Sequence, residues 1–225
     1  VEAIRARDSV SDQQSVQARK TLAVFQAIGF CRRMYGPRAI GPFIVSMTLG
    51  PDDILSVLLL ANWSELHNRR DEVPLDIAPL LETVNDLKRG TEVLRSMLDN
   101  DLYREHLRQR NEQQTVMIGY SDSNKDSGLA SARWALQNAQ VDLVNVVAER
   151  NIELHLFHGR GGTISRGGGK THTAVLGAPP GTVNGHLRVT EQGEIINEKY
   201  GLRGIALRTL EQMPCLLYTS AAADE

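Results

Sequence analysis

Hydroxyl, carboxylate and ammonium side chains crowd one short stretch of the sequence, between Gly119 and Gly128. Asp122 and Lys125 lie within it, together with several serines. A carboxylate suits a metal cation and an ammonium group suits a phosphate, so the stretch is typical of an anion or metal site. Capping of a helix that begins near Leu129 would explain one or two of these residues. Capping leaves Lys125 unexplained, because a cation near a helix N-terminus opposes the helix dipole.

A second stretch, from Phe157 to Lys170, interleaves glycines with cationic side chains. It holds six glycines together with His158, Arg160 and Arg166. Glycine lets backbone N–H groups approach an oxyanion closely, and arginine offers paired N–H donors to a phosphate or carboxylate. We therefore expect a ligand with several charged oxygens. The charge density disfavours a flexible linker. An Arg-Gly-Gly module that binds RNA is a weaker alternative, because the stretch occurs once and follows a strand.

A third carboxylate, Glu82, ends the apolar run from Ile77 to Leu81. An exposed carboxylate is more often solvated than functional. Paired with Asp122, however, Glu82 would supply two oxygen ligands and leave positions open for water and a phosphate, which is how proteins usually bind Mg²⁺. Three histidines follow no ligand spacing and are assigned to structure or surface: His155, His172 and His186.

These chemical groups all follow short apolar runs that alternate with helical patterns. The runs predict strands near residues 43–47, 77–81, 115–119 and 152–157. Apolar residues three or four apart predict helices over 16–34, 54–60, 91–110 and 129–147. This alternation predicts an α/β fold with parallel strands, either a doubly wound sheet or part of a barrel. In both folds chemistry gathers beyond the carboxyl ends of the strands.

The composition indicates which kinds of partner and which cellular compartment to expect. The 225 residues include 25 basic and 27 acidic side chains, a net charge of -2, so we expect neither nucleic-acid nor membrane partners. No run approaches the roughly 20 apolar residues that cross a bilayer, which predicts a cytoplasmic protein. Two cysteines without a ligand spacing favour a reducing compartment. The first residue is Val1 rather than methionine, which suggests a truncated chain.

Two motifs carry a resemblance to a known family. They are residues 116–126, which read VMIGYSDSNKD, and the glycine-arginine stretch over 157–169, and the run LRVTEQGE over 187–194 follows them in order. With these motifs the chain resembles the phosphoenolpyruvate carboxylase family from about Glu2 to Gln212. The resemblance implies an internal fragment of a phosphoenolpyruvate/pyruvate-binding (β/α) barrel of the TIM type, with many helices.

The resemblance also implies an activity. Family members are lyases that use Mg²⁺ or Mn²⁺ to join bicarbonate to phosphoenolpyruvate, which yields oxaloacetate and phosphate. This reaction fixes carbon dioxide and supplies four-carbon acids to the tricarboxylic acid cycle. The residues that match family metal ligands are Glu82 and Asp122. The residues that match the catalytic and phosphate-holding groups are Lys125, His158, Arg160 and Arg166. The parent protein is expected to be a homotetramer.

The match to the family is incomplete at both ends. Residues 1–212 are expected to belong to the catalytic barrel domain. Residues 213–225 are expected to be a non-native tail, since Pro214 should break the helix predicted there. An upstream catalytic histidine of the family has no counterpart, so we expect the fragment itself to be inactive. A different phosphoenolpyruvate- or pyruvate-binding barrel enzyme, such as a mutase or phosphotransferase, is the alternative.

Overall fold

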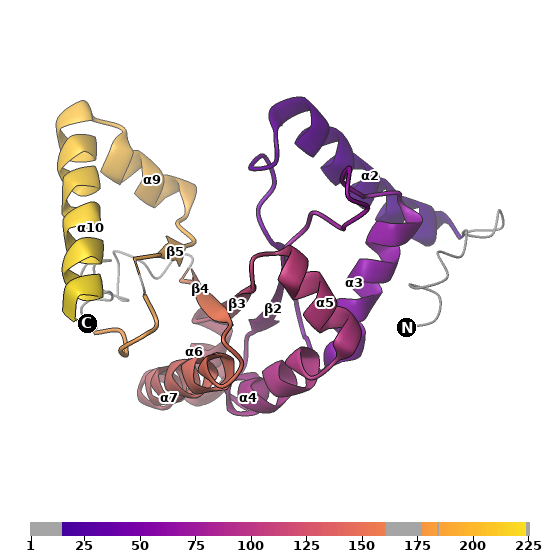
Figure 1. The fold of residues 1–225 in the computed structure, drawn as a ribbon. Coiled ribbons are helices and arrows are strands. Elements are labelled where there is room, and N and C mark those ends of the chain that lie inside the picture. The colour runs from indigo at the N-terminus through magenta and orange to yellow at the C-terminus, as the bar shows by residue number, and fades with distance from the viewer. Residues whose placement is uncertain (1–14, 161–176, 184, 224–225) are drawn as a thin grey trace.

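A computed structural model describes residues 15–160, 177–183 and 185–223 of the chain (Figure 1). Helices and strands alternate through most of it, as the sequence predicts. In chain order the elements are α2 (Val16–Tyr35), β1 (Phe43–Val45), α3 (Pro51–Trp63), β2 (Ile77–Leu81), α4 (Val84–Leu98), α5 (Asp101–Gln109), β3 (Gln113–Gly119), α6 (Ser121–Ser127), α7 (Leu129–Ala148), β4 (Glu153–Gly159), β5 (Arg188–Val189), α9 (Gly193–Tyr200) and α10 (Arg203–Ala223). The predicted α/β class is confirmed.

The strands form one five-stranded sheet in the order β1-β2-β3-β4-β5. Every neighbouring pair is parallel. Each strand also lies beside the one before it in the chain. Because all the pairs are parallel, the carboxyl ends of the described strands lie at the same edge of the sheet. A doubly wound sheet reverses its strand order at a switch point. No such reversal occurs among the described strands.

One face of the sheet carries the hydrophobic core. Alternate residues of β3 and β4 are buried there: Val116, Ile118, Leu154 and Leu156. They cluster with apolar residues of α4 and α7, including Leu94 and Leu143. In Figure 1 these two helices lie side by side below the strands. Burying each such leucine or isoleucine contributes about 2 kcal/mol, so the period-two strand pattern determines which face the helices cover.

The residues that alternate with these core residues along β3 and β4 point to the opposite face of the sheet. Thr115 and Met117 of β3 are half-buried on this face, and so is His155 of β4. Arg188 of β5 belongs to this face as well, since its guanidinium carbon lies 4.7 Å from the centroid of the Phe157 ring. This face is therefore more polar than the core face.

The two edges of the sheet come close to one another. A Cβ atom placed on Gly41, just before β1, would lie only 2.5 Å from Nη2 of Arg188 on β5. In a flat sheet the first and fifth strands would be separated by about 19 Å, or four strand spacings. One arginine side chain does not span that distance, so the sheet curves and brings the Arg188 guanidinium to the segment before β1.

Side-chain caps decide where several helices begin. The Thr83 hydroxyl accepts from the Asp86 amide at 3.1 Å, and the Asp86 carboxylate accepts from the Thr83 amide at 2.9 Å, which closes a capping box at the start of α4. Asn100 caps α5 in a similar way, accepting from the amides of Leu102 and Tyr103. The helical segments predicted over 91–110 are therefore the end of α4 and the whole of α5, and Asn100 opens the second of them.

The end of the chain corrects one prediction. The helix α10 extends from Arg203 to Ala223 with Pro214 inside it, so the break expected at Pro214 is wrong. The non-native origin of residues 213–225 stays a prediction. Within the described residues, no helix combines the length and apolar character that crossing a bilayer requires.

Candidate active site

Three adjacent strands end beside one another with polar residues. Leu81 of β2 pairs with Ile118 of β3, and Gly119 of β3 pairs with Gly159 of β4. Glu82 follows β2, the helix α6 follows β3, and Arg160 follows β4. The predicted site residues of these three segments therefore lie at one edge of the sheet, at the carboxyl ends of its strands.

Two glycines let these strand ends approach closely. A Cβ atom on Gly119 would lie 3.1 Å from the Cα atom of Glu82. A Cβ atom on Gly159 would lie 2.9 Å from Cε of Met117 and 3.1 Å from the carbonyl oxygen of Ile118. A side chain at either position would require the neighbouring atoms to shift by a few tenths of an ångström. Packing at the sheet edge therefore favours glycine at both positions, before any ligand is considered.

Glu82 is held by neighbours on both sides. Its Oε2 atom accepts a hydrogen bond from the Ser46 hydroxyl at 3.1 Å, and Ser46 directly follows β1. Its backbone amide donates to the Asp86 carboxylate at 3.3 Å, so the capping box of α4 also fixes the Glu82 backbone. These contacts place the Glu82 carboxylate at the carboxyl edge of the sheet.

Asp122 and Lys125 form a local ion pair on α6. Nζ of Lys125 lies 3.0 Å from Oδ1 of Asp122, and both side chains are exposed. Because α6 ends at Ser127 before α7 begins, Lys125 occupies the last turn of its own helix. A cation is favourable there, so the conflict with the helix dipole expected from the sequence does not arise. Asp122 occupies the first turn, where a carboxylate is favourable.

His158 and Tyr120 form a buried polar pair. The Tyr120 hydroxyl and Nδ1 of His158 are 2.9 Å apart, and both side chains are buried. Burial lowers the pKa of His158 to about 4, with a further contribution from the charge of Arg160. Burial raises the pKa of Tyr120, while Arg160 and Arg133 oppose that shift. At neutral pH the imidazole is uncharged and the phenol keeps its proton.

Two arginines lie close to the Tyr120 ring. The guanidinium carbon of Arg160 lies 5.6 Å from the ring centroid, and that of Arg133 on α7 lies 5.4 Å from it. Both distances suit a cation–π contact. The side chain of Arg160 is only 2% exposed, and burial lowers its pKa from the ordinary value. Two positive charges thus lie near the aromatic ring at the carboxyl end of the sheet.

The predicted residues therefore gather into three local groups at one edge. Glu82 is with Ser46, Asp122 is with Lys125, and His158 and Arg160 are with Tyr120. Arg166 lies outside the described residues. The carboxylates of the first two groups offer only oxygen donors, which fits a hard divalent cation that keeps water in its remaining positions.

Comparison with known proteins decides the family. A family model described as phosphoenolpyruvate carboxylase matches residues 4–223, almost the whole chain. The chain belongs to the phosphoenolpyruvate carboxylase family. The match includes residues 213–223, which the sequence resemblance had left out.

Curated relatives carry the same name. The chain is 53% identical over 191 residues to the phosphoenolpyruvate carboxylase of Xanthomonas campestris pv. campestris, which covers 85% of this chain. It is 46% identical over 202 residues to that of Corynebacterium diphtheriae, covering 90% of this chain, and 43% identical over 215 residues to that of Mycobacterium leprae, covering 94%. The chain spans only 21% to 23% of the length of these relatives.

Sequence reasoning missed three contributors to the candidate site of this phosphoenolpyruvate carboxylase family member. Tyr120 had a detectable signal, because it continues the buried alternation of Val116 and Ile118 past the end of β3. Ser46 and Arg133 had none. Ser46 meets Glu82 through the pairing of β1 with β2, and Arg133 reaches the Tyr120 ring from α7, beyond the intervening helix α6.

Proposed function

We propose that this chain forms part of an enzyme that carboxylates phosphoenolpyruvate with bicarbonate to oxaloacetate and phosphate. One observation carries the proposal: in a member of this family, Glu82, Asp122 and Lys125 follow two adjacent parallel strands at the same edge, with Arg160 after the next strand. Carboxylates and cations at that edge suit a substrate with phosphate and carboxylate groups and a divalent metal.

We also propose that the curved sheet is part of a (β/α) barrel. A barrel wall has parallel strands in chain order, with helices outside and the carboxyl ends at one mouth. The unreversed strand order and the contact of Arg188 with the segment around Gly41 support this assignment. The polar face that carries Arg188 would then line the barrel interior, and α4 and α7 would lie outside.

Glu82 and Asp122 would hold Mg²⁺ or Mn²⁺ in the proposed enzyme. Bound there, the ion would supply positive charge to the phosphoryl and enolate oxygens. The Ser46 hydroxyl and the α4 capping box orient Glu82, and the first turn of α6 favours the ionised form of Asp122. The match of both residues to family ligands rests on the family resemblance.

The reaction requires cations where negative charge develops. Bicarbonate attacks phosphorus, the bond from phosphorus to the enol oxygen breaks, and carboxyphosphate and the enolate of pyruvate form. Carboxyphosphate then breaks down to CO2 and phosphate, and the enolate carbon attacks CO2. Lys125, Arg160 and Arg166 would stabilise the phosphoryl and enolate charges. His158, neutral and held by Tyr120, would donate or accept a hydrogen bond without adding charge.

A cytoplasmic location and a homotetrameric parent protein belong to the same proposal. The location rests on the sequence, which has no membrane-length apolar run and no cysteine ligand spacing. The tetramer rests on the family resemblance, as do the assignments of phosphoenolpyruvate and bicarbonate as the substrates. The isolated chain is expected to be inactive, because it covers 21% of the Xanthomonas relative.

A chimeric enzyme tests the proposal. The matching segment of the Xanthomonas campestris enzyme would be replaced by that of this chain, and phosphate release and oxaloacetate formation would be measured with phosphoenolpyruvate and Mg²⁺. We expect both products in equal amounts and only when bicarbonate is present. A chimera that folds by circular dichroism but releases no phosphate would contradict the proposal. Phosphate release without bicarbonate would favour a phosphotransferase instead.

A further inference from the structure

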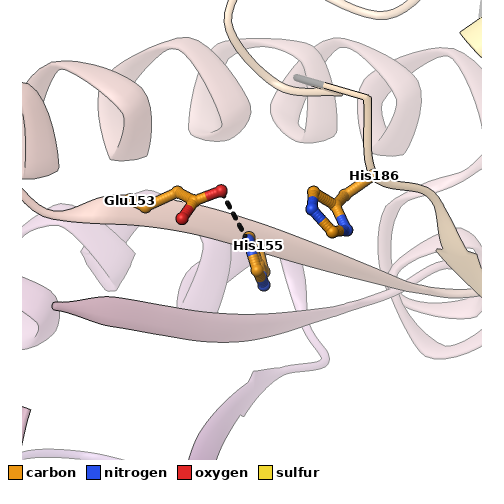
Figure 2. Close-up of side chains that lie close together, drawn as sticks. All are labelled: Glu153, His155 and His186. Atoms are coloured by element: carbon orange, nitrogen blue, oxygen red, sulfur yellow. Dashed lines mark hydrogen bonds and ion pairs between the residues drawn. The ribbon is translucent and has the colours of Figure 1, made fainter. Parts of the chain in front are cut away.

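A second cluster of possible metal ligands lies at the opposite end of β4 from the candidate active site. It consists of Glu153 and His155 on β4 together with His186, which precedes β5 (Figure 2). From Glu153 to Gly159 the strand extends for about 20 Å, so the two sites are far apart. Among the described residues, this is the sole group of three His, Cys, Asp or Glu side chains whose ligand atoms converge.

Strand register explains why these residues meet. Arg188 pairs with Phe157 in the parallel ladder between β4 and β5. Two residues earlier on each segment, the same register brings His186 opposite His155. Side chains two apart in a strand share a face, so the histidine pair lies on the face where Arg188 covers Phe157. The pair His155 and His186 therefore lies next to the pair Phe157 and Arg188 on the polar face of the sheet.

The three side chains point toward one another. Nε2 of His155 lies 2.9 Å from Oε1 of Glu153, and the rings of His155 and His186 stack with centroids 4.6 Å apart at 29°. One nitrogen or oxygen atom from each residue lies within 4.8 Å of the others. Figure 2 shows His186 facing the Glu153–His155 pair.

A neighbouring amide holds the carboxylate in place. Nε2 of Gln113 donates to Oε2 of Glu153 at 2.8 Å, and Gln113 is paired with Glu153 in the β3–β4 ladder. This bond uses one carboxylate oxygen and leaves Oε1 directed at His155. Such outer contacts orient ligands in metal sites and tune their affinity.

We propose that Glu153, His155 and His186 form a binding site for Zn²⁺ or a similar divalent transition metal. Two imidazole nitrogens and one carboxylate suit Zn²⁺, whereas Mg²⁺ requires oxygen ligands. Ligand atoms around tetrahedral Zn²⁺ lie about 3.3 Å apart. The ligand atoms are now 2.9 Å apart for His155 and Glu153 and within 4.8 Å for all three residues. Small rotations of these side chains, which are not fully buried, would bring them to that spacing. The ion would replace the proton on Nε2 of His155, which would move to Nδ1 through solvent, and water would complete the coordination.

The proposed ion would fasten the segment before β5 to β4. His186 is separated from Arg188 by one residue, so a metal link at His186 would also hold the Arg188 guanidinium over Phe157 and beside Gly41. The site would thereby stabilise the curvature of the sheet rather than take part in chemistry at the other end of the strands.

Zinc binding to the 225-residue chain tests the site. Isothermal titration with ZnCl2 should give one ion per chain. His186→Ala and Glu153→Gln should each weaken binding by at least tenfold, and Gln113→Ala should weaken it less. His67→Ala is the matched control, because His67 also lies near a carboxylate, 3.9 Å from Asp71, without a third ligand in the described structure. Its affinity should equal that of the unsubstituted chain.

Two further measurements distinguish a specific metal site from nonspecific binding at the surface. Bound Co²⁺ should give visible absorption bands of a four- or five-coordinate ion, and Zn²⁺ should raise the unfolding temperature of the unsubstituted chain but not of the His186→Ala variant. Circular dichroism of the metal-free variants should match that of the unsubstituted chain. Equal affinity in the His186→Ala, Glu153→Gln and His67→Ala variants would overturn the proposal.

Discussion

At the level of single residues, the hydrogen bond between Tyr120 and His158 should contribute to stability. Tyr120→Phe removes the hydroxyl and leaves Nδ1 of His158 without this buried partner. We expect the free energy of unfolding to fall by about 1–3 kcal/mol. Urea denaturation of the chain at pH 7 measures it. The exposed Tyr35 gives a matched control, since Tyr35→Phe should change stability by less than about 0.5 kcal/mol. Equal effects of the two substitutions would refute this role.

Substitution of Lys125 should lower catalytic activity with little effect on stability. Its side chain is exposed and pairs only locally with Asp122 in the contacts described above. In a full-length relative, substitution of the corresponding lysine by alanine should lower kcat by about 100-fold or more, because a cation is lost where charge develops. The exposed Lys88 on α4 provides the control substitution. Turnover near that of the unsubstituted enzyme would exclude a catalytic role for Lys125.

At the level of elements, the N-terminus of α4 links helix stability to the candidate metal ligand. Thr83→Ala removes the hydroxyl that accepts from the Asp86 amide, and should destabilise the chain by about 1 kcal/mol. Thr91→Ala, within the same helix, is the control. Chemical denaturation compares the two variants. A loss no larger for Thr83→Ala than for Thr91→Ala would show that the cap contributes nothing.

At the level of the whole molecule, a buried histidine should make stability depend on pH. His106 of α5 lies 3.1 Å from the carbonyl oxygen of Leu75, and burial lowers its pKa to about 4. The positive charge of Arg110 contributes to the lowering, and Asp76 opposes it. The unfolded chain, with an ordinary pKa of 6.5, binds the proton first. Stability is therefore complete above pH 6.5 and falls as the pH decreases toward 4.

The size of this loss is measurable by urea denaturation at pH 7 and pH 5. His106 should account for about 2 kcal/mol of the decrease, since each pKa unit corresponds to about 1.4 kcal/mol. In His106→Gln, which cannot take up the proton, the decrease between the two pH values should be smaller by that amount. An unchanged decrease would mean that other groups cause the acid sensitivity.

Much of the fold follows from local pattern. Alternation in β3 and β4 and the three-to-four spacing in α7 predicted these elements within a few residues, because burial of one face imposes its period on the sequence. Boundaries that depend on a single hydrogen bond were harder. The helix α4 begins at Val84, before the predicted start at Thr91, and α10 continues through Pro214.

The sequence alone determined the family, the α/β class and the segments that hold the candidate site residues, because motifs and periodicity are properties of neighbouring residues. It also located Glu82, Asp122 and Arg160 at strand ends. The chain order of the sheet, the approach of Arg188 to Gly41 and the meeting of His155 with His186 required the tertiary structure. Pairing register joins residues that are distant in the chain, and no spacing in the sequence records which strands will lie side by side.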